Sequence, residues 1–545
     1  MFELEFKFLS CLLIISSGLF AQPVISFQKC YGTSGTDYFA DAIITNDNGF
    51  ASVVEFGGVD GFMEFQDSLV YPATFMKFDS NLDLEWVKNF GGSAGSGFLK
   101  LFQKDNGDYI LGGLTSDIDG DFSDNHGSLD LMLVKTDSNG NKLWSKCYGS
   151  PGFENFESFL PTQDGGYLIS GYSSSSGGDI PYHYGDGFSY DALIMKTDSE
   201  GNTEWVKVFG GSSDDSPLGN IIEIKRGYYI LHIGAHSDDY DLAGSGFIGD
   251  KRWIIKLDSL GNIVADTIYS GVDDLNTFND DEIILLNNKM YLAGAANPGT
   301  DLFPGVTGIG GLYDGGIATY DENLNFTSLN IFGGSLLDIL KRIEVDEFNN
   351  YYFLGYSLSN DFDLPGNYNN QAASDYWLLK TDSNFNLLWS KNFGGSDPCG
   401  DLACSGFKGE IIVKGNLLYG FIKNVVPEIL PDFDIACGLL GTGNTDAWIV
   451  VFDLTTEINN MVKPKSEYLI YPNPANNEIT IQNNTNGLNY SISILDVFGH
   501  NIYFEDNVTS PSHIIYLSNY LEGIYFISIE NCDGTIFNSK IIFHI

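Results

Sequence analysis

Hydrophobic and polar residues follow each other in short blocks along most of the chain, and one block recurs. Its clearest copy is residues 131–150, LMLVKTDSNGNKLWSKCYGS. An apolar run reaches Asp137, a Ser-Asn-Gly-Asn turn follows, and the chain returns through Trp144 to Tyr148 and Gly149. Because Asn-Gly between apolar stretches supplies the positive φ of a tight turn, the block predicts a β-hairpin.

The glycine at the end of each block, one or two residues after an aromatic residue, marks a long repeat. These glycines are Gly32, Gly91, Gly149, Gly210, Gly271, Gly333 and Gly394, at intervals of 59, 58, 61, 61, 62 and 61 residues. Each unit contains four strand candidates, which in one unit are 155–162, 167–172, 191–198 and 203–209. No helical periodicity competes with them. Seven units of four antiparallel strands predict an all-β fold, a seven-bladed β-propeller over residues 26–454.

The two ends of the repeat region predict how the ring closes. The third strands are expected at 75–79, 131–137, 192–198, 253–258, 317–321, 377–382 and 448–453. The seventh has no strand after it, whereas residues 26–31 match the fourth-strand pattern. We therefore expect the N-terminal strand to complete the last blade, which removes exposed sheet edges. Four tryptophans at one repeat position are expected to pack between neighbouring blades: Trp86, Trp144, Trp205 and Trp389.

Both ends of the chain differ from the repeats. Residues 1–21 are typical of a secretory signal peptide, with Lys7 before an apolar run and Ala21 as the cleavage point. Residues 455–466 are polar and non-repetitive, with Pro464 between two lysines, and are typical of a linker. After them, residues 478–482, 490–495 and 524–529 alternate apolar and polar positions, so residues 467–545 predict a small β-sandwich.

Three ordered motifs in this last segment carry a family resemblance. They are Tyr471-Pro472-Asn473-Pro474-Ala475, the stretch 494–499 (ILDVFG), and Leu517-Ser518 followed by 521–525 (LEGIY). The segment resembles the type A sorting domain of the Bacteroidetes type IX secretion system. The resemblance implies that the machinery at the outer membrane reads this domain and often cleaves it. It also implies export through the periplasm to the medium or the outer cell surface, with the secretion machinery as partner.

The hairpin step Asp137, Gly140 and Trp144 is also similar to the blade motif of quinoprotein-like propellers, whereas the shorter spacing of the sialidase Asp-box does not fit. This likeness concerns the blade and does not imply a quinone cofactor.

Composition narrows the function classes. The chain has 72 acidic and 27 basic residues and a net charge of −45, which repels nucleic acids and anionic membrane surfaces. No stretch after the signal approaches the roughly 20 apolar residues of a transmembrane helix.

The cysteines allow one local disulfide, among Cys399, Cys404 and Cys437. Cys30 and Cys147 occupy one repeat position and are not expected to pair. Otherwise the cysteines are expected to be small packing residues.

Recurring acid pairs are the first candidate chemistry. The loops between second and third strands share a face with the glycine loops between blades, and they carry the pairs Asp119 and Asp121, Asp239 and Asp241, Asp361 and Asp363, and Asp432 and Asp434. Closely spaced carboxylates can ligate calcium, although no complete EF-hand pattern is present. The alternative is that they cap turns and face water.

The longest loop of the third repeat adds aromatic residues to this face: Tyr182, His183, Tyr184 and Phe188. They could stack on sugar rings or pack locally. His232 and His236 would lie roughly 13 Å apart on a strand, too far for one metal. Residues 91–95 match G-x-S-x-G but lack the strand-turn-helix elbow that activates such a serine.

No catalytic, cofactor-binding or metal-binding residue is assigned from these patterns, and calcium is the one cofactor considered. The sequence predicts an exported or surface-attached binding or adhesion module for a polysaccharide or a protein. The alternatives are a secreted glycan-degrading hydrolase or lyase with its site at the propeller mouth, and a structural surface component.

Overall fold

The computed structural model describes most of the chain. The described residues are 23–58, 71–185, 188–245, 251–270, 282–286, 289–296, 313–364, 374–394, 409–425, 445–455, 468–471, 478–483, 490–495, 501–510, 512–516, 523–531 and 536–543. The chain divides into two compact units, residues 1–455 and 456–545. The signal segment 1–21 and the linker lie almost wholly outside the described residues.

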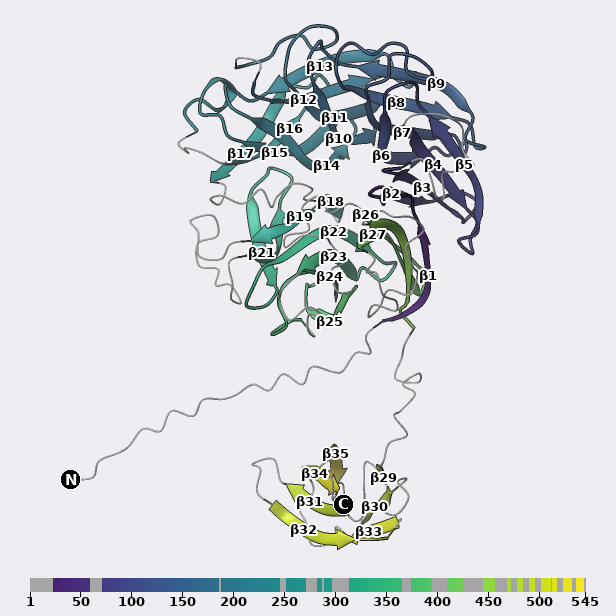
Figure 1. Cartoon of the computed structure of the whole chain (residues 1–545). Coiled ribbons are helices and arrows are strands. Elements are labelled where there is room, and N and C mark those ends of the chain that lie inside the picture. Colours follow the sequence, from purple (N-terminus) through teal and green to yellow (C-terminus); the bar gives the residue numbers. More distant parts are fainter. Residues whose placement is uncertain are drawn as a thin grey trace, which may run out of the picture. The chain divides into compact units, whose positions relative to one another are not determined.

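Seven four-stranded antiparallel sheets make up the first unit, as predicted for a propeller (Figure 1). The first blade contains β2 (Tyr38–Ile44), β3 (Phe50–Glu55), β4 (Ala73–Phe78) and β5 (Leu84–Phe90). The second contains β6 (Ser96–Gln103), β7 (Tyr109–Thr115), β8 (Asp130–Thr136) and β9 (Lys142–Tyr148). The third contains β10 (Glu154–Pro161), β11 (Tyr167–Ser173), β12 (Asp191–Thr197) and β13 (Thr203–Phe209). The fourth contains β14 (Asp215–Lys225), β15 (Tyr228–Ala235), β16 (Lys251–Leu257) and β17 (Ile263–Ser270).

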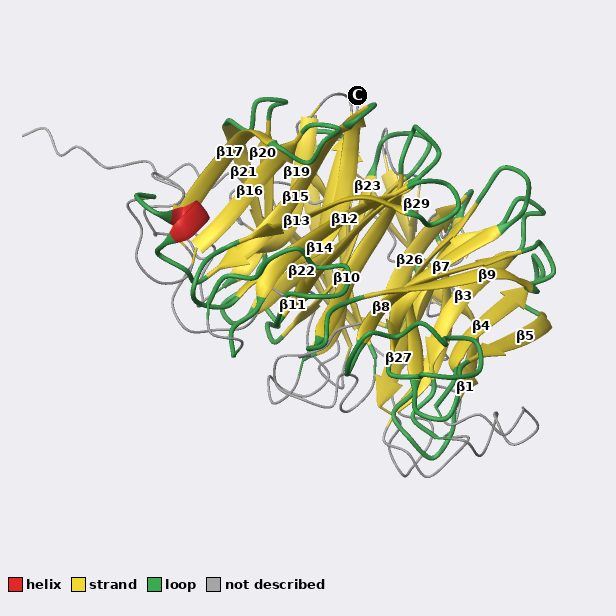
Figure 2. Cartoon of the chain, turned by 90° about the horizontal axis from the view of Figure 1, so that it is seen from above, coloured by secondary structure: helices red, strands yellow, loops and turns green. Residues whose placement is uncertain are grey.

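The remaining blades follow the same order. The fifth contains β18 (Glu282–Leu286), β19 (Lys289–Ala296), β20 (Asp314–Tyr320) and β21 (Phe326–Phe332). The sixth contains β22 (Asp338–Val345), β23 (Tyr351–Ser357), β24 (Asp375–Thr381) and β25 (Leu387–Phe393). The seventh contains β26 (Gly409–Lys414), β27 (Leu417–Val425), β28 (Thr445–Asp453) and the N-terminal strand β1 (Val24–Tyr31). Strands dominate the described part of the chain, and the short 3-10 turn η2 (Tyr240–Leu242) is drawn red in Figure 2.

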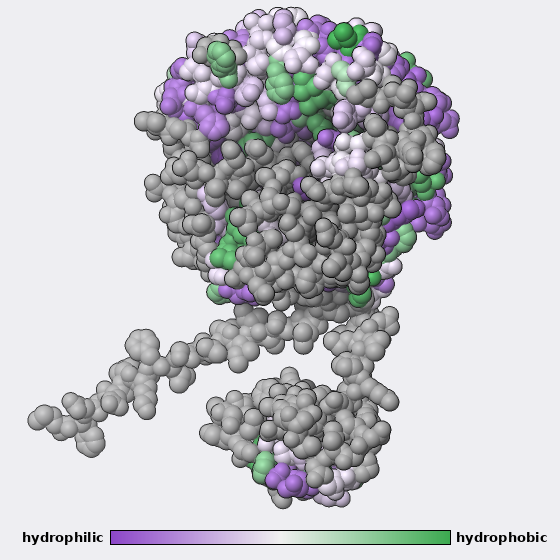
Figure 3. Space-filling model, viewed as in Figure 1, coloured by the Kyte–Doolittle hydropathy of each residue, from purple (hydrophilic) through white to green (hydrophobic). Residues whose placement is uncertain are grey.

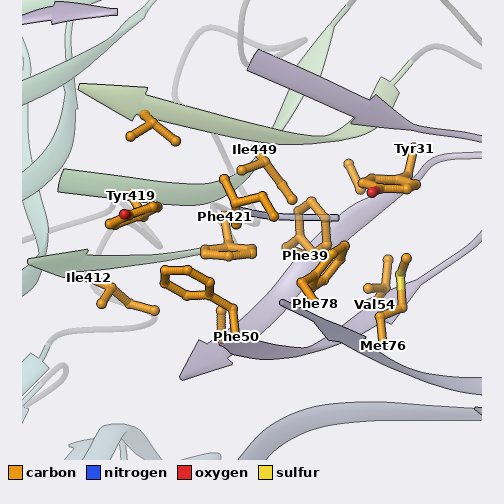
Figure 4. Close-up of a cluster of buried hydrophobic side chains, with 14 of the residues drawn as sticks. Tyr31, Phe39, Phe50, Val54, Met76, Phe78, Ile412, Tyr419, Phe421 and Ile449 are labelled. Carbon is orange, nitrogen blue, oxygen red and sulfur yellow. The ribbon is translucent and has the colours of Figure 1, made fainter. Parts of the chain in front are cut away.

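The predicted closure by the N-terminal strand is confirmed. β1 pairs antiparallel with β28, with Cys30 opposite Trp448 and Tyr31 opposite Ala447. The seventh blade then packs on the first through one aromatic cluster (Figure 4). In this cluster the ring centroids of Phe39 and Phe421 lie 5.4 Å apart, edge to face. The last blade therefore contains both ends of the repeat region.

The first strand of each blade lies at the centre of the ring. These strands contact one another in a closed cycle, from β2 through β6, β10, β14, β18, β22 and β26 back to β2. Several of them carry a β-bulge at the same place, for example at Ala40 in β2, Leu99 in β6 and Lys341 in β22. A bulge bends a strand and re-aims the side chains beside it.

The repeated hairpin turn and its tryptophan have the predicted roles. The Asp137 carboxylate accepts hydrogen bonds from the amides of Asn139 and Asn141 at 2.9 and 2.8 Å, and Gly140 has a φ of +74°. A Cβ atom on Gly140 would lie 2.9 Å from the Trp86 ring of the preceding blade. The tryptophan thus packs against the turn of the next blade. The predicted third strands began up to three residues after the observed third strands. The predicted ranges also included the aspartate of the turn as their last residue.

Two cysteines can be placed. Cys30 in β1 is disulfide-bonded and Cys147 is a buried free thiol, so these two are not paired, as predicted. Cys30 is also buried in a hydrophobic cluster of the sixth and seventh blades, so it has a disulfide in addition to a packing role. The predicted local pairing of Cys399, Cys404 and Cys437 lies outside the described residues.

The second unit consists of two small sheets. One contains β29 (Tyr468–Tyr471), β30 (Glu478–Asn483) and β33 (Ser512–Tyr516). The other contains β31 (Tyr490–Leu495), β32 (Asn501–Val508), β34 (Gly523–Asn531) and β35 (Ile536–Phe543). One buried cluster includes Ile481 and Ile515 from the first sheet and Ile492 and Ile529 from the second. Side chains from both sheets therefore share one core.

Candidate binding site at the mouth of the propeller

The recurring acid pairs bind backbone amides of the glycine loops between blades. The Asp119 carboxylate accepts the Ser93 amide at 2.8 Å, and the Asp121 carboxylate accepts the Gly91 amide at 3.1 Å. The same two bonds recur from Asp239 to Ser212 and Asp241 to Gly210, and from Asp361 to Ser335 and Asp363 to Gly333. These bonds confirm that both sets of loops share one face, which we call the mouth of the propeller.

These contacts give the acid pairs a structural role. Each carboxylate oxygen that holds a glycine loop has less capacity left for a cation. Among the described residues, no group of three or more His, Cys, Asp or Glu side chains is arranged to hold a metal ion. The fourth pair, Asp432 and Asp434, lies outside the described residues.

A pocket of about 580 Å³ opens at the mouth between the first three blades. Tyr38, Glu55 and Tyr71 come from the first blade, and Asn155 and Glu157 come from β10 of the third. The second blade supplies glycines, Ser96 and the apolar side chains Leu99 and Leu114. The described residues that line the pocket include two acids and no basic side chain. Pockets of 300–1,000 Å³ with an apolar lining and a few polar groups are typical of small-molecule sites.

Hydrogen bonds fix the polar side chains of this pocket. The Tyr38 hydroxyl donates to the Glu55 carboxylate, and the Ser96 hydroxyl donates to Asp117 at 2.7 Å. The Asn155 amide donates to the Tyr172 hydroxyl at 2.6 Å. The space beside Gly97 is open, because a Cβ atom added there would lie 3.8 Å from its nearest neighbour, a carboxylate oxygen of Glu55. The glycine therefore leaves open space in front of fixed polar groups.

The predicted aromatic loop lies at the junction of the third and fourth blades. The Tyr182 and Tyr184 ring centroids are 5.6 Å apart, and Tyr184 stacks on Tyr240 at 4.6 Å with an interplanar angle of 29°. Tyr240 belongs to the loop of the next blade, which the sequence did not connect with this cluster. Phe188 is 90% exposed, and the His183 ring lies 3.4 Å from the Asp191 carboxylate.

The other two motifs are not brought together as sites. His232 is buried in β15, whereas His236 follows the strand and its ring nitrogen contacts the Asp214 carbonyl at 2.7 Å. The serine of the G-x-S-x-G match, Ser93, lies in a glycine loop held by Asp119. Neither arrangement has the geometry of a metal pair or of a nucleophile elbow.

An ionic network at the centre of the ring was missed by sequence reasoning. The Lys100 ammonium lies 3.5 Å from Asp41 and 3.9 Å from Glu410, and the Arg342 guanidinium lies 3.6 Å from Glu410. The Asp41 carboxylate also accepts the Leu101 amide of the next blade at 2.9 Å. Burial raises the pKa of Glu410 against the opposing effect of the two cations. The sequence signal for this network was a charged residue within the first strand of a blade, where most other residues are apolar.

Solved structures resemble the chain only distantly. BBS1N in complex with ARL6DN has a TM-score of 0.39 and 7% identity, over 80% of this chain and 97% of that one. A Synechocystis apocarotenoid oxygenase mutant has a TM-score of 0.35 and 12% identity, over 68% and 94%. The parainfluenza virus 5 hemagglutinin-neuraminidase ectodomain has a TM-score of 0.32 and 10% identity, over 64% and 80%. At these scores none of them supports an inference about function.

No curated protein matches the chain, whereas a segment of the second unit matches the model of a protein family. No helix in the described residues is long and apolar enough to cross a membrane. Residues 469–544 match the family model described as secretion system C-terminal sorting domain. The chain therefore ends in a sorting domain of the type IX secretion system, which indicates secretion or attachment to the cell surface.

Proposed function

We propose that this protein is an exported saccharide-binding module of the cell surface or the medium, with its ligand site in the pocket at the propeller mouth. The sorting domain supports delivery outside the cell. The pocket is the observation that carries the binding function, because it joins open volume to aromatic and hydrogen-bonding side chains. N-terminal export through residues 1–21 and passage through the periplasm are part of the proposal.

The pocket lining selects the ligand by charge and shape. Glu55 and Glu157 line the pocket, and a carboxylate is a hydrogen-bond acceptor. The net charge of −45 repels anions from the whole molecule. Tyr71 lines the pocket and is 55% exposed. A ligand that has hydroxyl donors and an apolar face, with or without an amino group, complements such a lining. The proposed ligands are neutral or amino saccharides, and acidic saccharides are excluded.

Calorimetric titration with neutral and amino oligosaccharides tests this site. Gly97→Val fills the open space beside Glu55 and should weaken binding at least about tenfold, because the ligand loses its volume. Glu55→Gln removes a charge-assisted acceptor and should weaken binding by a smaller factor. Glu347→Gln is the matched control, since Glu347 is exposed in the distant β22–β23 turn. Binding by Gly97→Val as tight as by the wild type would contradict the pocket assignment.

A secreted glycan-degrading hydrolase or lyase is the second candidate, and one observation favours it. Two carboxylic acids, Glu55 and Glu157, line one aromatic pocket, and paired acids are the catalytic groups of most glycosidases. New reducing ends released from an oligosaccharide, and lost in Glu157→Gln, would establish the enzyme. If the protein neither binds nor cleaves any saccharide tested, the proposal is wrong and a structural surface role is favoured.

A further inference from the structure

Tyr240 adopts a backbone conformation that is costly for an aromatic residue. Its φ is +46°, and the equivalent Phe362 of the sixth blade has a φ of +53°. The same loop position is occupied by Gly120 and Gly178, with φ of +64° and +55°. This loop position is therefore left-handed in the four blades where it is described, the second, third, fourth and sixth. Glycine adopts it freely, whereas a bulky side chain adopts it at an energetic cost.

Burial does not compensate for this cost. The Tyr240 side chain is 59% exposed and the Phe362 side chain is 70% exposed. The Tyr240 ring stacks on Tyr184 within the chain and still keeps more than half of its surface exposed, so it can contact a ligand outside the chain.

The three tyrosines at this edge form a fixed surface, which we call the tyrosine platform: Tyr182, Tyr184 and Tyr240. The Tyr182 hydroxyl donates to the Val208 carbonyl at 3.1 Å, and the Tyr184 hydroxyl hydrogen-bonds the Asp241 carboxylate. Tyr240 stacks on Tyr184 across the junction of two blades. The η2 turn that carries Tyr240 lies among the loops at the propeller edge (Figure 2).

We propose that the tyrosine platform stacks on a neutral polysaccharide chain, as a second contact beyond the pocket. The proposal rests on the proposed saccharide-binding function and extends it from a small ligand to a polymer. Aromatic faces match the apolar faces of sugar rings. Asp238 pairs with Lys251, and Asp241 accepts the Gly210 amide, so each carboxylate keeps only its remaining lone pairs for hydroxyl groups of a sugar. The net charge of −45 repels anionic polymers.

A protein partner fits this surface less well. Three aromatic side chains bury at most about 150–250 Å² each, which falls short of the roughly 800 Å² per partner of a stable protein interface. Protein interface centres are also depleted in acidic residues, whereas acids flank this platform. On the described part of the face shown in Figure 3, hydrophobic residues form small separate patches among hydrophilic ones.

Affinity electrophoresis in gels containing soluble starch, mixed-linkage β-glucan, galactomannan or alginate tests the proposal. The wild type should be retarded by at least one of the three neutral polymers and not by alginate. Tyr240→Gly removes the backbone cost and the stack on Tyr184 together, so its melting temperature should stay close to the wild-type value. Its affinity for the retarding polymer should fall roughly tenfold. Phe348→Ala is the control, because Phe348 is 73% exposed in a β22–β23 turn at the opposite end of the blade.

Each outcome decides the matter. Equal retardation of Tyr240→Gly and wild type overturns the platform, as does retardation by alginate alone or by no polymer. The pocket variant Gly97→Val separates the two sites. Polymer retardation that persists in Gly97→Val but not in Tyr240→Gly supports the platform even if the pocket assignment fails. Loss of oligosaccharide binding only in Gly97→Val supports the pocket even if the platform fails.

Discussion

The backbone amide of Asp37 donates a hydrogen bond to the carbonyl oxygen of Thr445, 3.2 Å away. Asp37 precedes the first strand of the first blade, and Thr445 begins the third strand of the last. The side chain of Thr445 lies within 3.0 Å of the same amide. Together with the pairing of β1 and β28, this contact joins the two ends of the repeat region.

Deleting residues 23–31 should open the ring at this joint. The deletion removes β1 and its disulfide-bonded Cys30, so β28 becomes an edge strand with unpaired amides and carbonyls. We expect a lower melting temperature and concentration-dependent association in size-exclusion chromatography. A synthetic peptide VISFQKCY should restore the monomer by strand addition. A monomer of unchanged stability without the peptide would show that β1 does not hold the ring closed.

Two glycine substitutions separate the blade-to-blade contact from backbone strain. Gly140→Ala places a Cβ at positive φ and 2.9 Å from the Trp86 ring, whereas Gly165→Ala is also at positive φ with nothing within 4 Å. Both substitutions should lower the free energy of unfolding by about 1 kcal/mol, because alanine is strained at positive φ. Gly140→Ala should lower it by roughly 1–3 kcal/mol more, because the added methyl group overpacks the contact. Chemical denaturation measures the difference. Equal losses in the two variants would rule out packing of the turn against the tryptophan.

The acid pairs predict a stability that does not depend on calcium. Asp119→Ala leaves the Ser93 amide without its carboxylate acceptor and should cost roughly 1–2 kcal/mol. Excess chelator or added calcium should leave the wild-type melting temperature unchanged, because backbone amides already hold these carboxylates. A rise of several degrees on adding calcium, absent in Asp119→Ala, would instead establish a calcium site.

Stability should fall as the pH rises through the weakly acidic range. Burial, and next the charge of Glu282, raises the pKa of Glu344 from 4.5 to about 7. The folded protein therefore keeps a proton that the unfolded chain releases, so this contribution to stability is full below pH 4.5 and is lost by about pH 7. Glu344→Gln should flatten the melting temperature between pH 5 and 7 relative to the exposed control Glu347→Gln. Identical pH profiles of the two variants would contradict the assignment to Glu344.

The fold could be predicted because most blades repeat the same local signals. The Asp137 turn, the glycine after Tyr148 and the tryptophan recur at a fixed interval, and the position of β1 follows from the missing strand. The sites depend on contacts between residues far apart in the sequence. Asp41 and Glu410 meet at the centre through Lys100, and Tyr184 meets Tyr240 across a blade junction, so no local pattern shows them.

Deletion of residues 467–545 tests most directly whether the propeller is exported by its C-terminal domain. The measurement is immunodetection of the propeller in periplasmic, surface and medium fractions, with the full chain as reference. The full chain should be found at the surface or in the medium, and the truncated chain should accumulate in the periplasm as a folded propeller. Release of the truncated chain at the level of the full chain would contradict the role of residues 469–544 as the sorting domain.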